Sequence, residues 1–212
     1  MIKYFYILVF ISITIPGSFS RIITTVDPPS SYTVEGISKE TGITLFSQDY
    51  DNKIGINVGY QQIIFYREKF NLYAGAEFML GKKAESRIAF HSVYIMPSFL
   101  LKDNLALSVR FGMTQINTDQ SNFNLDMGLL GSLGLEYKIS DNITLGFDYC
   151  LYDIKNKTVD DISGFNPPLI SNISEDGILI EIEPIDMDLS YSKFGFSIIY
   201  GLEINNKKEK RL

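Results

Sequence analysis

The stretch GLEYKISDNITLGFDY, residues 134–149, alternates large apolar residues with small or charged ones. Leu135, Tyr137 and Ile139 follow this pattern, and it resumes after a short polar break and continues through residues 143–149. Successive side chains of a β-strand point to opposite faces of the sheet. The pattern therefore predicts two antiparallel strands that share one continuous apolar face.

The same alternation recurs along the chain, in segments longer than the usual strand of a soluble sheet. Short polar breaks at 67–69, 102–104 and 140–142 separate some of these segments, and longer polar stretches at 82–87, 117–124 and 155–188 separate others. Regular alternation of short and long connections is typical of an up-and-down β-barrel. The predicted strands are 54–66, 70–81, 88–101, 105–116, 125–139, 143–153 and 189–204.

The short breaks also predict a register. If both strands of a hairpin keep their apolar residues on one face, a three-residue loop is required, because a slip of one residue reverses every side chain. The expected opposing pairs are Tyr66 with Phe70, Leu101 with Leu105, and Ile139 with Ile143.

The composition of the two faces predicts which one contacts water. The polar face consists mainly of glycine and serine with isolated charges, which suits a narrow barrel interior better than a solvated sheet surface. The opposite face is apolar almost throughout, as a lipid-facing belt requires. The alternative is a soluble, lipocalin-like ligand carrier with the same faces reversed. After residue 20, the sequence has no apolar run long enough for a membrane-spanning helix.

Seven strands require an eighth if both ends of the barrel chain lie at the short-turn end. We expect the first strand within residues 33–48, where GITLFSQ (42–48) alternates best. The alternative eighth strand is GILIEIE (177–183), which would move the chain ends to the long-loop end. The predicted fold class is all-β: a transmembrane antiparallel barrel of eight strands.

The N-terminal sequence predicts export. Residues 1–20 combine Lys3, an apolar run and the small residues Ser18 and Ser20, which together indicate a cleaved secretory signal peptide. The whole chain has 19 basic and 25 acidic residues, so removing Lys3 leaves 18 against 25, a net charge of −7. This balance argues against nucleic acid as a partner. One histidine and one cysteine give no basis for a metal site or cofactor.

These features predict five parts of the chain. They are a signal peptide at 1–20, an N-terminal periplasmic segment at 21–40, a barrel at 41–204, a long extracellular loop at 155–188 within it, and a basic C-terminal tail at 205–212.

The architecture, together with phrases such as GLEYKISDN, resembles the small outer-membrane β-barrel proteins of Gram-negative bacteria, of the OmpA/OmpX type. The resemblance implies the cell outer membrane as location. It also implies periplasmic chaperones and the barrel assembly machinery as partners in biogenesis. In that family the last strand carries an assembly signal, which Lys193, Gly195, Ile198 and Tyr200 match here.

Several charges fall on the inward face of the predicted barrel. They either pair with one another and plug the lumen or line a passage, and the small interior of eight strands favours the plug. Cys150 falls on the same inward-facing side of its predicted strand and is expected to be a small buried residue. The predicted lumen charges are Glu77, Arg110, Glu136, Asp148 and Lys193.

The loop 155–188 is strongly acidic. It has eight carboxylates against Lys155 and Lys157, a net charge of −6. Such a loop is either a solvated surface or a binding surface for a basic partner or, weakly, for divalent cations. Its acidic residues are Asp160, Asp161, Glu175, Asp176, Glu181, Glu183, Asp186 and Asp188.

An enzyme of the barrel wall is the remaining class. Lipid A deacylases use a His and a Ser on one face, whereas His91 and Ser92 are adjacent and point to opposite faces. We therefore expect a non-enzymatic, monomeric outer-membrane protein with a structural or surface-interaction role. The alternative is a narrow pore for small solutes or ions.

Overall fold

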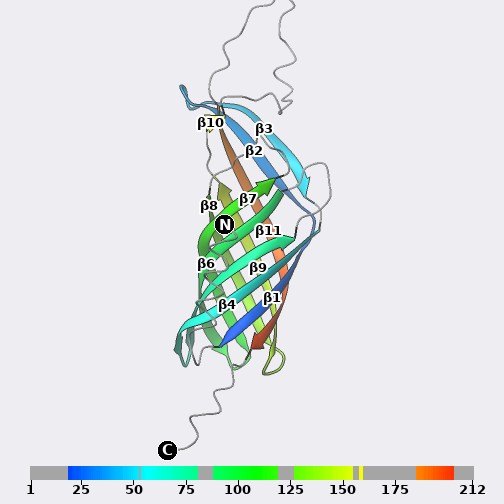
Figure 1. Ribbon diagram of the computed structural model, residues 1–212, viewed down its shortest axis with the longest axis vertical. Coiled ribbons are helices and arrows are strands. Elements are labelled where there is room, and N and C mark those ends of the chain that lie inside the picture. The colour runs from blue at the N-terminus through cyan, green and yellow to red at the C-terminus, as the bar shows by residue number, and fades with distance from the viewer. Residues whose placement is uncertain are drawn as a thin grey trace, which may run out of the picture.

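The computed structural model describes residues 19–52, 54–80, 88–118, 127–154, 158–159 and 185–202. In these residues every regular element is a β-strand (Figure 1). The strands are β1 Ser20–Asp27, β2 Ser30–Ser38, β3 Thr44–Asn52, β4 Gly55–Arg67, β5 Phe70–Leu80, β6 Ile88–Lys102, β7 Leu105–Thr118, β8 Gly128–Lys138, β9 Ile143–Ile154, β10 Thr158–Val159 and β11 Ile185–Leu202.

None of the described residues belongs to a helix long and apolar enough to cross a membrane.

The wall is a closed antiparallel barrel. Neighbouring strands follow the order β1-β4-β5-β6-β7-β8-β9-β11, and β11 pairs back with β1 from Ser20↔Leu202 to Val26↔Phe196. Eight strands of the described chain therefore enclose the interior, as predicted from the sequence. The strands tilt across the barrel axis in Figure 1, and the short turns lie at its lower end.

The first strand lies elsewhere than predicted. β1 occupies residues that we expected in a periplasmic segment, and it pairs with β4 from Ser20↔Gln62 to Asp27↔Gly55. Beyond Pro28-Pro29, β2 and β3 continue the same antiparallel register, from Ser30↔Asn52 to Gly36↔Phe46. The prediction of a first wall strand within 33–48 is wrong, because this range contains the tip of a long first hairpin, formed by β2 and β3. The two prolines interrupt the alternation between β1 and β2.

That hairpin rises beyond the rest of the barrel. β2 pairs with the upper part of β11, from Ile185↔Ser38 to Tyr191↔Tyr32. β10 also pairs with β11, at Thr158↔Asp186 and Val159↔Ile185. β2, β3, β10 and the start of β11 thus form a sheet that stands above the barrel wall in Figure 1. We call this part the extracellular sheet, after the side of the membrane on which the sequence predicts the long loop 155–188.

The predicted register holds through the body of all three short hairpins. Ile56 pairs with Leu80, Ser98 with Ser108, and Lys138 with Thr144, as the expected turn pairs require. Only the turn at 140–142 has the predicted three-residue form. In the other two, a β-bulge near Ile64 or Leu101 absorbs one residue, and the strands close on two-residue turns at 68–69 and 103–104.

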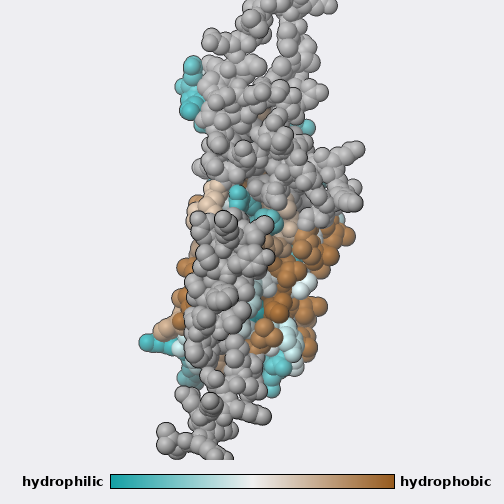
Figure 2. Space-filling model, in the orientation of Figure 1, coloured by the Kyte–Doolittle hydropathy of each residue, from teal (hydrophilic) through white to brown (hydrophobic). Residues whose placement is uncertain are grey.

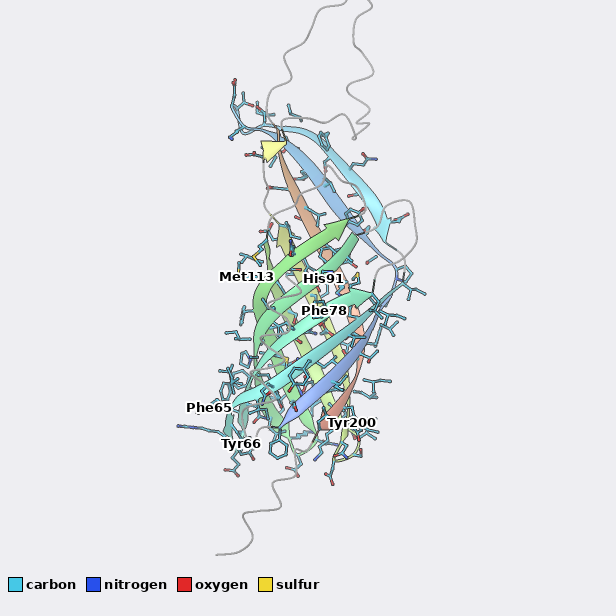
Figure 3. All side chains as sticks on the ribbon, viewed as in Figure 1. Phe65, Tyr66, Phe78, His91, Met113 and Tyr200 are labelled. Atoms are coloured by element: carbon cyan, nitrogen blue, oxygen red, sulfur yellow. The ribbon has the colours of Figure 1, made fainter. Side chains whose placement is uncertain are left out.

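The prediction for the two faces is confirmed. Leu135, Tyr137 and Phe147 are exposed on the outside, whereas Glu136 and Asp148 are 8% and 5% exposed on the inside. In Figure 2 the hydrophobic residues form a band on the barrel, with hydrophilic residues at its lower end and above it. Phe65, Tyr66 and Tyr200 lie at the lower end (Figure 3), where aromatic rings suit a membrane interface.

Candidate functional site: the barrel interior and the extracellular sheet

The lower interior holds one ion pair. Arg21 of β1 donates two hydrogen bonds to the carboxylate of Glu136 on β8, at 2.7 and 3.1 Å. The same guanidinium donates to the amide oxygen of Gln61 and lies over the ring of Tyr73, 3.9 Å from its centroid. Four strands are thereby tied together across the lumen.

Five charged side chains form a second layer, which we call the middle cluster: Asp27, Glu77, Arg110, Asp148 and Lys193. Arg110 donates to Glu77 at 2.8 Å and to Asp148 at 2.5 Å. Lys193 donates to Asp27 at 2.7 Å and lies 3.9 Å from Glu77. The cluster therefore contains three carboxylates and two cationic groups.

Neutral groups complete the middle cluster. The Cys150 thiol donates to Asp148 Oδ2 at 2.7 Å, and the Asn57 amide donates to Asp27 Oδ2. All five charged side chains are buried, so their mutual pairing replaces hydration in a low-dielectric interior.

Aromatic rings fill the interior above the middle cluster. Phe90 stacks on Tyr191 with centroids 4.9 Å apart and an interplanar angle of 2°, and it lies 4.7 Å from Tyr152. Tyr32 of β2 meets Tyr191 edge-on. We call these four rings the aromatic plug. Leu130, Ile154 and Leu189 are buried in the same core cluster.

Glycines make room for the large interior side chains. Tyr94 on β6 lies between Gly75 of β5 and Gly112 of β7 in the pairing register. A Cβ added at Gly75 would lie 2.6 Å from the Tyr94 ring, and one at Gly112 would lie 2.6 Å from Tyr94 Cβ. Both glycines thus lie where the Tyr94 side chain covers the neighbouring strand. The inward face, which the sequence predicted to consist mainly of glycine and serine with isolated charges, also has large side chains such as Tyr94.

The outward face of the extracellular sheet is acidic. Glu35 of β2 pairs directly with Asp188 of β11, and Thr33 donates a 2.6 Å hydrogen bond to Asp49 of β3. Asp188 faces the same side of β11 as the lipid-facing residues Phe194 and Phe196 lower in that strand. Glu35 lies on this outward face because it pairs with Asp188. The outward-facing carboxylates of the extracellular sheet are Glu35, Asp49, Asp51, Asp186 and Asp188, and Asp153 faces outward near the upper end of β9.

The structure brings all five predicted lumen charges inside the barrel. Glu77, Arg110, Asp148 and Lys193 meet in the middle cluster, while Glu136 lies lower, with Arg21. Of the predicted assembly signal, Lys193 and Gly195 face inward, and Ile198 and Tyr200 face outward at 61% and 47% exposure.

Some predicted residues lie outside the described part of the chain. These are the signal peptide up to residue 18, the tail at 205–212, the alternative strand at 177–183, and six acidic loop residues: Asp160, Asp161, Glu175, Asp176, Glu181 and Glu183. Asp186 and Asp188 are described, and both lie at the start of β11.

His91 and Ser92 lie on opposite sides of the wall. The His91 ring is 5.3 Å from that of Phe78 on the outside, and Figure 3 shows the two together on the upper wall. Ser92 donates to Thr114 inside the barrel at 3.0 Å. This geometry does not pair a nucleophile with a base.

Two functional side chains were missed in the sequence. Arg21 and Asp27 complete the interior ion pairs, and both lie in β1, which we had placed outside the barrel. Their signal was present, because Arg21, Ile23, Thr25 and Asp27 alternate with Ile22, Thr24 and Val26.

The described residues include no group of three or more His, Cys, Asp or Glu side chains arranged to hold a metal ion.

No protein-family model matches the sequence, and no curated protein matches it. Solved structures do match. OprG from Pseudomonas aeruginosa, an outer membrane protein, has a TM-score of 0.50 at 12% identity, over 88% of this chain and 96% of its own. Ail, the attachment invasion locus protein of Yersinia pestis, has a TM-score of 0.44 at 11% identity, over 89% of this chain and 100% of its own.

The outer membrane protease OmpT from Escherichia coli has a TM-score of 0.49 at 9% identity, over 89% of this chain and 98% of its own. At these identities only the fold is informative, and of the three the likeness to OprG supports it. Together with the closed wall, the apolar outside and the paired charges inside, it shows that this chain has the eight-stranded transmembrane β-barrel fold of small bacterial outer-membrane proteins.

Proposed function

We propose that this protein resides in the outer membrane of a Gram-negative bacterium and acts there as a surface-interaction protein. The observation that carries this proposal is the extracellular sheet, which extends the barrel wall above the apolar belt as regular paired strands. Paired strands hold side chains in fixed positions, so an outward face on them can present a defined surface to a partner.

The chemistry of that face favours a basic partner. Five carboxylates share it, and Glu35 lies directly opposite Asp188, where two like charges destabilise a sheet by themselves. A lysine- or arginine-rich polypeptide would relieve this repulsion on binding, and opposite charges would speed its approach. The sequence between β10 and β11 has six further carboxylates.

The packing of the interior supports this role over that of a pore. Two layers of ion pairs and the aromatic plug occupy the lumen between the turns and the extracellular sheet. An eight-stranded barrel has an interior just wide enough to be filled by side chains.

The test measures binding of a fluorescent oligolysine peptide to the full chain in lipid nanodiscs. Replacing Glu35, Asp49 and Asp188 by Gln, Asn and Asn should weaken binding roughly five- to tenfold, since each exposed ion pair contributes about 0.2–1 kcal/mol. The effect should shrink with added salt.

The matched control removes three carboxylates at the turn end: Glu68→Gln, Asp103→Asn and Asp141→Asn. This variant should bind the peptide like the original protein. Equal weakening in both variants would show that net charge alone drives binding and would refute the proposed surface. Discrete conductance steps from the original protein in a planar bilayer would favour the pore instead.

A further inference from the structure

The barrel wall is interrupted at Pro28-Pro29. On one side of the first strand, pairing with β11 stops at Val26↔Phe196 and resumes at Tyr32↔Tyr191, so residues 27–31 face only residues 192–195. On the other side, the pairs among the described residues end at Asp27↔Gly55 and begin again at Ser30↔Asn52. Proline has no N–H to donate, so both neighbouring ladders lose hydrogen bonds at this height.

The middle cluster lies directly behind this interruption. Asp27 is the last residue of β1, and its Oδ2 accepts hydrogen bonds from Lys193 and Asn57. Its other carboxylate oxygen, Oδ1, is buried and has no hydrogen-bond partner among the described residues. Asp27 itself is 1% exposed.

The net charge of the middle cluster favours the binding of a small cation. Asp27, Glu77 and Asp148 are balanced by only Arg110 and Lys193, so one carboxylate is in excess when all five groups are ionised. A buried unbalanced charge is costly in a low-dielectric interior. A small cation close to Asp27 Oδ1 would remove the imbalance and give that oxygen a partner.

The routes along the barrel axis are occupied. Phe90, Tyr152 and Tyr191 stack above the middle cluster, and the Arg21–Glu136 pair lies below it. We propose that the interruption at Pro28-Pro29 is a side entrance through which water and small cations reach the middle cluster at Asp27. This inference concerns the wall of the barrel and is independent of the partner proposed for the extracellular sheet.

Cys150 supplies a natural reporter. It is the only cysteine of the chain, it is 1% exposed, and its thiol donates to Asp148 of the middle cluster. A methanethiosulfonate reagent forms a mixed disulfide with a reachable thiol and releases methanesulfinate, so mass spectrometry gives the rate of access. The refolded barrel in detergent micelles is treated with the cationic aminoethyl reagent and with its anionic sulfonatoethyl counterpart.

The proposal predicts two results. The cationic reagent should label Cys150 at least about tenfold faster than the anionic one, and Asp27→Asn should reduce that preference. The double variant Pro28→Thr, Pro29→Thr restores two N–H donors and should slow labelling roughly tenfold. Equal rates for the two reagents, or unchanged labelling in the double variant, would overturn the proposal.

Pro97→Thr is the matched control. Pro97 also interrupts pairing, between Ile95↔Phe111 and Ser98↔Ser108, but the register is the same on both sides. This variant should leave the labelling rate unchanged, and slower labelling in it than in the Pro28/Pro29 variant would place the entrance between β6 and β7.

Hydrogen exchange on the original protein keeps the test decisive if a variant does not fold. Amides of residues 192–195 should exchange faster than those of residues 196–200, which are paired on both sides. Equal protection of the two segments would contradict a side entrance.

Discussion

At the residue scale, the stability of the interior depends on ion pairs between buried side chains. Arg110 donates to two carboxylates at once, so Arg110→Met would leave both Glu77 and Asp148 buried without this partner. Removing one partner of a buried pair costs about 3–5 kcal/mol. We expect that loss in the free energy of unfolding, measured by circular dichroism against urea in detergent.

The exposed pair Lys138–Asp141 gives the comparison for this prediction. Its side chains are 48% and 94% exposed, and exposed ion pairs contribute little. Lys138→Met should therefore change the free energy of unfolding by no more than about 0.5 kcal/mol. A similar loss in both variants would mean that the interior charges are solvated and that the ion pairs do not hold the lumen closed.

Glycine positions give a second residue-scale prediction. A methyl group at Gly75 would overlap the Tyr94 ring, whereas an added Cβ at Gly131 would meet nothing within 4 Å. Gly75→Ala should lower the free energy of unfolding by about 1–3 kcal/mol, because a well-packed interior accommodates extra volume poorly. Gly131→Ala should be neutral or stabilising by up to about 1 kcal/mol. The same urea titration decides, and the opposite order would refute the packing argument.

The candidate site could be predicted from the sequence only in part. The alternation of side chains along each strand was enough to assign Glu77, Arg110, Glu136, Asp148 and Lys193 to the interior, because each side chain of a strand points to one of only two faces. Which charges pair is set by how the strands are staggered around the barrel, and no local pattern reports that. The sequence analysis missed the partners Arg21 and Asp27 for a simpler reason, because it did not predict their strand, β1.

At the scale of single elements, each wall strand has to match the depth profile of the membrane. Leu133 of β8 faces outward in the middle of the strand, and Tyr137 faces outward next to the turn. An arginine costs about 2–4 kcal/mol at the bilayer midplane and about 0–1 kcal/mol near the interface. We expect Leu133→Arg to destabilise the barrel in phospholipid by the larger amount and Tyr137→Arg by the smaller.

Folding titrations in liposomes measure this gradient, and detergent micelles provide the control, because they have no fixed midplane. Equal costs at the two positions in liposomes would mean that β8 does not cross the bilayer in the proposed orientation.

Strands were predicted correctly where apolar and polar residues alternate over many positions, and the prediction failed at the ends of these segments. β4 to β9 and β11 were found within a few residues, since period-two patterns over ten residues leave little ambiguity. The two-residue turns at 68–69 and 103–104 were missed, because a bulge changes loop length without changing the faces of the strand body. β1 and β2 were missed because Pro28-Pro29 divides one long strand into two short patterns.

At the scale of the whole molecule, two kinds of surface meet at the upper rim of the barrel. Below it the outside is apolar and suited to lipid, and above it the outward positions of β2, β3 and β11 carry carboxylates. β11 passes through this change as one continuous strand, so it connects the membrane-spanning wall directly to the extracellular sheet. Any force or partner acting on the sheet therefore acts directly on β11 and on the first hairpin.

The pairing of β11 with the first strand also has a kinetic consequence. Every other pair in the wall joins two of the eight wall strands that come one after the other along the chain, whereas Ser20 and Leu202 come together from almost opposite ends of the sequence. Contacts between distant residues form late, because the entropy of closing a long loop must be overcome first. During assembly the chain must therefore pass through an open curved sheet with two bare edges. In that interval a second copy competes with the chain's own terminus for the same backbone groups.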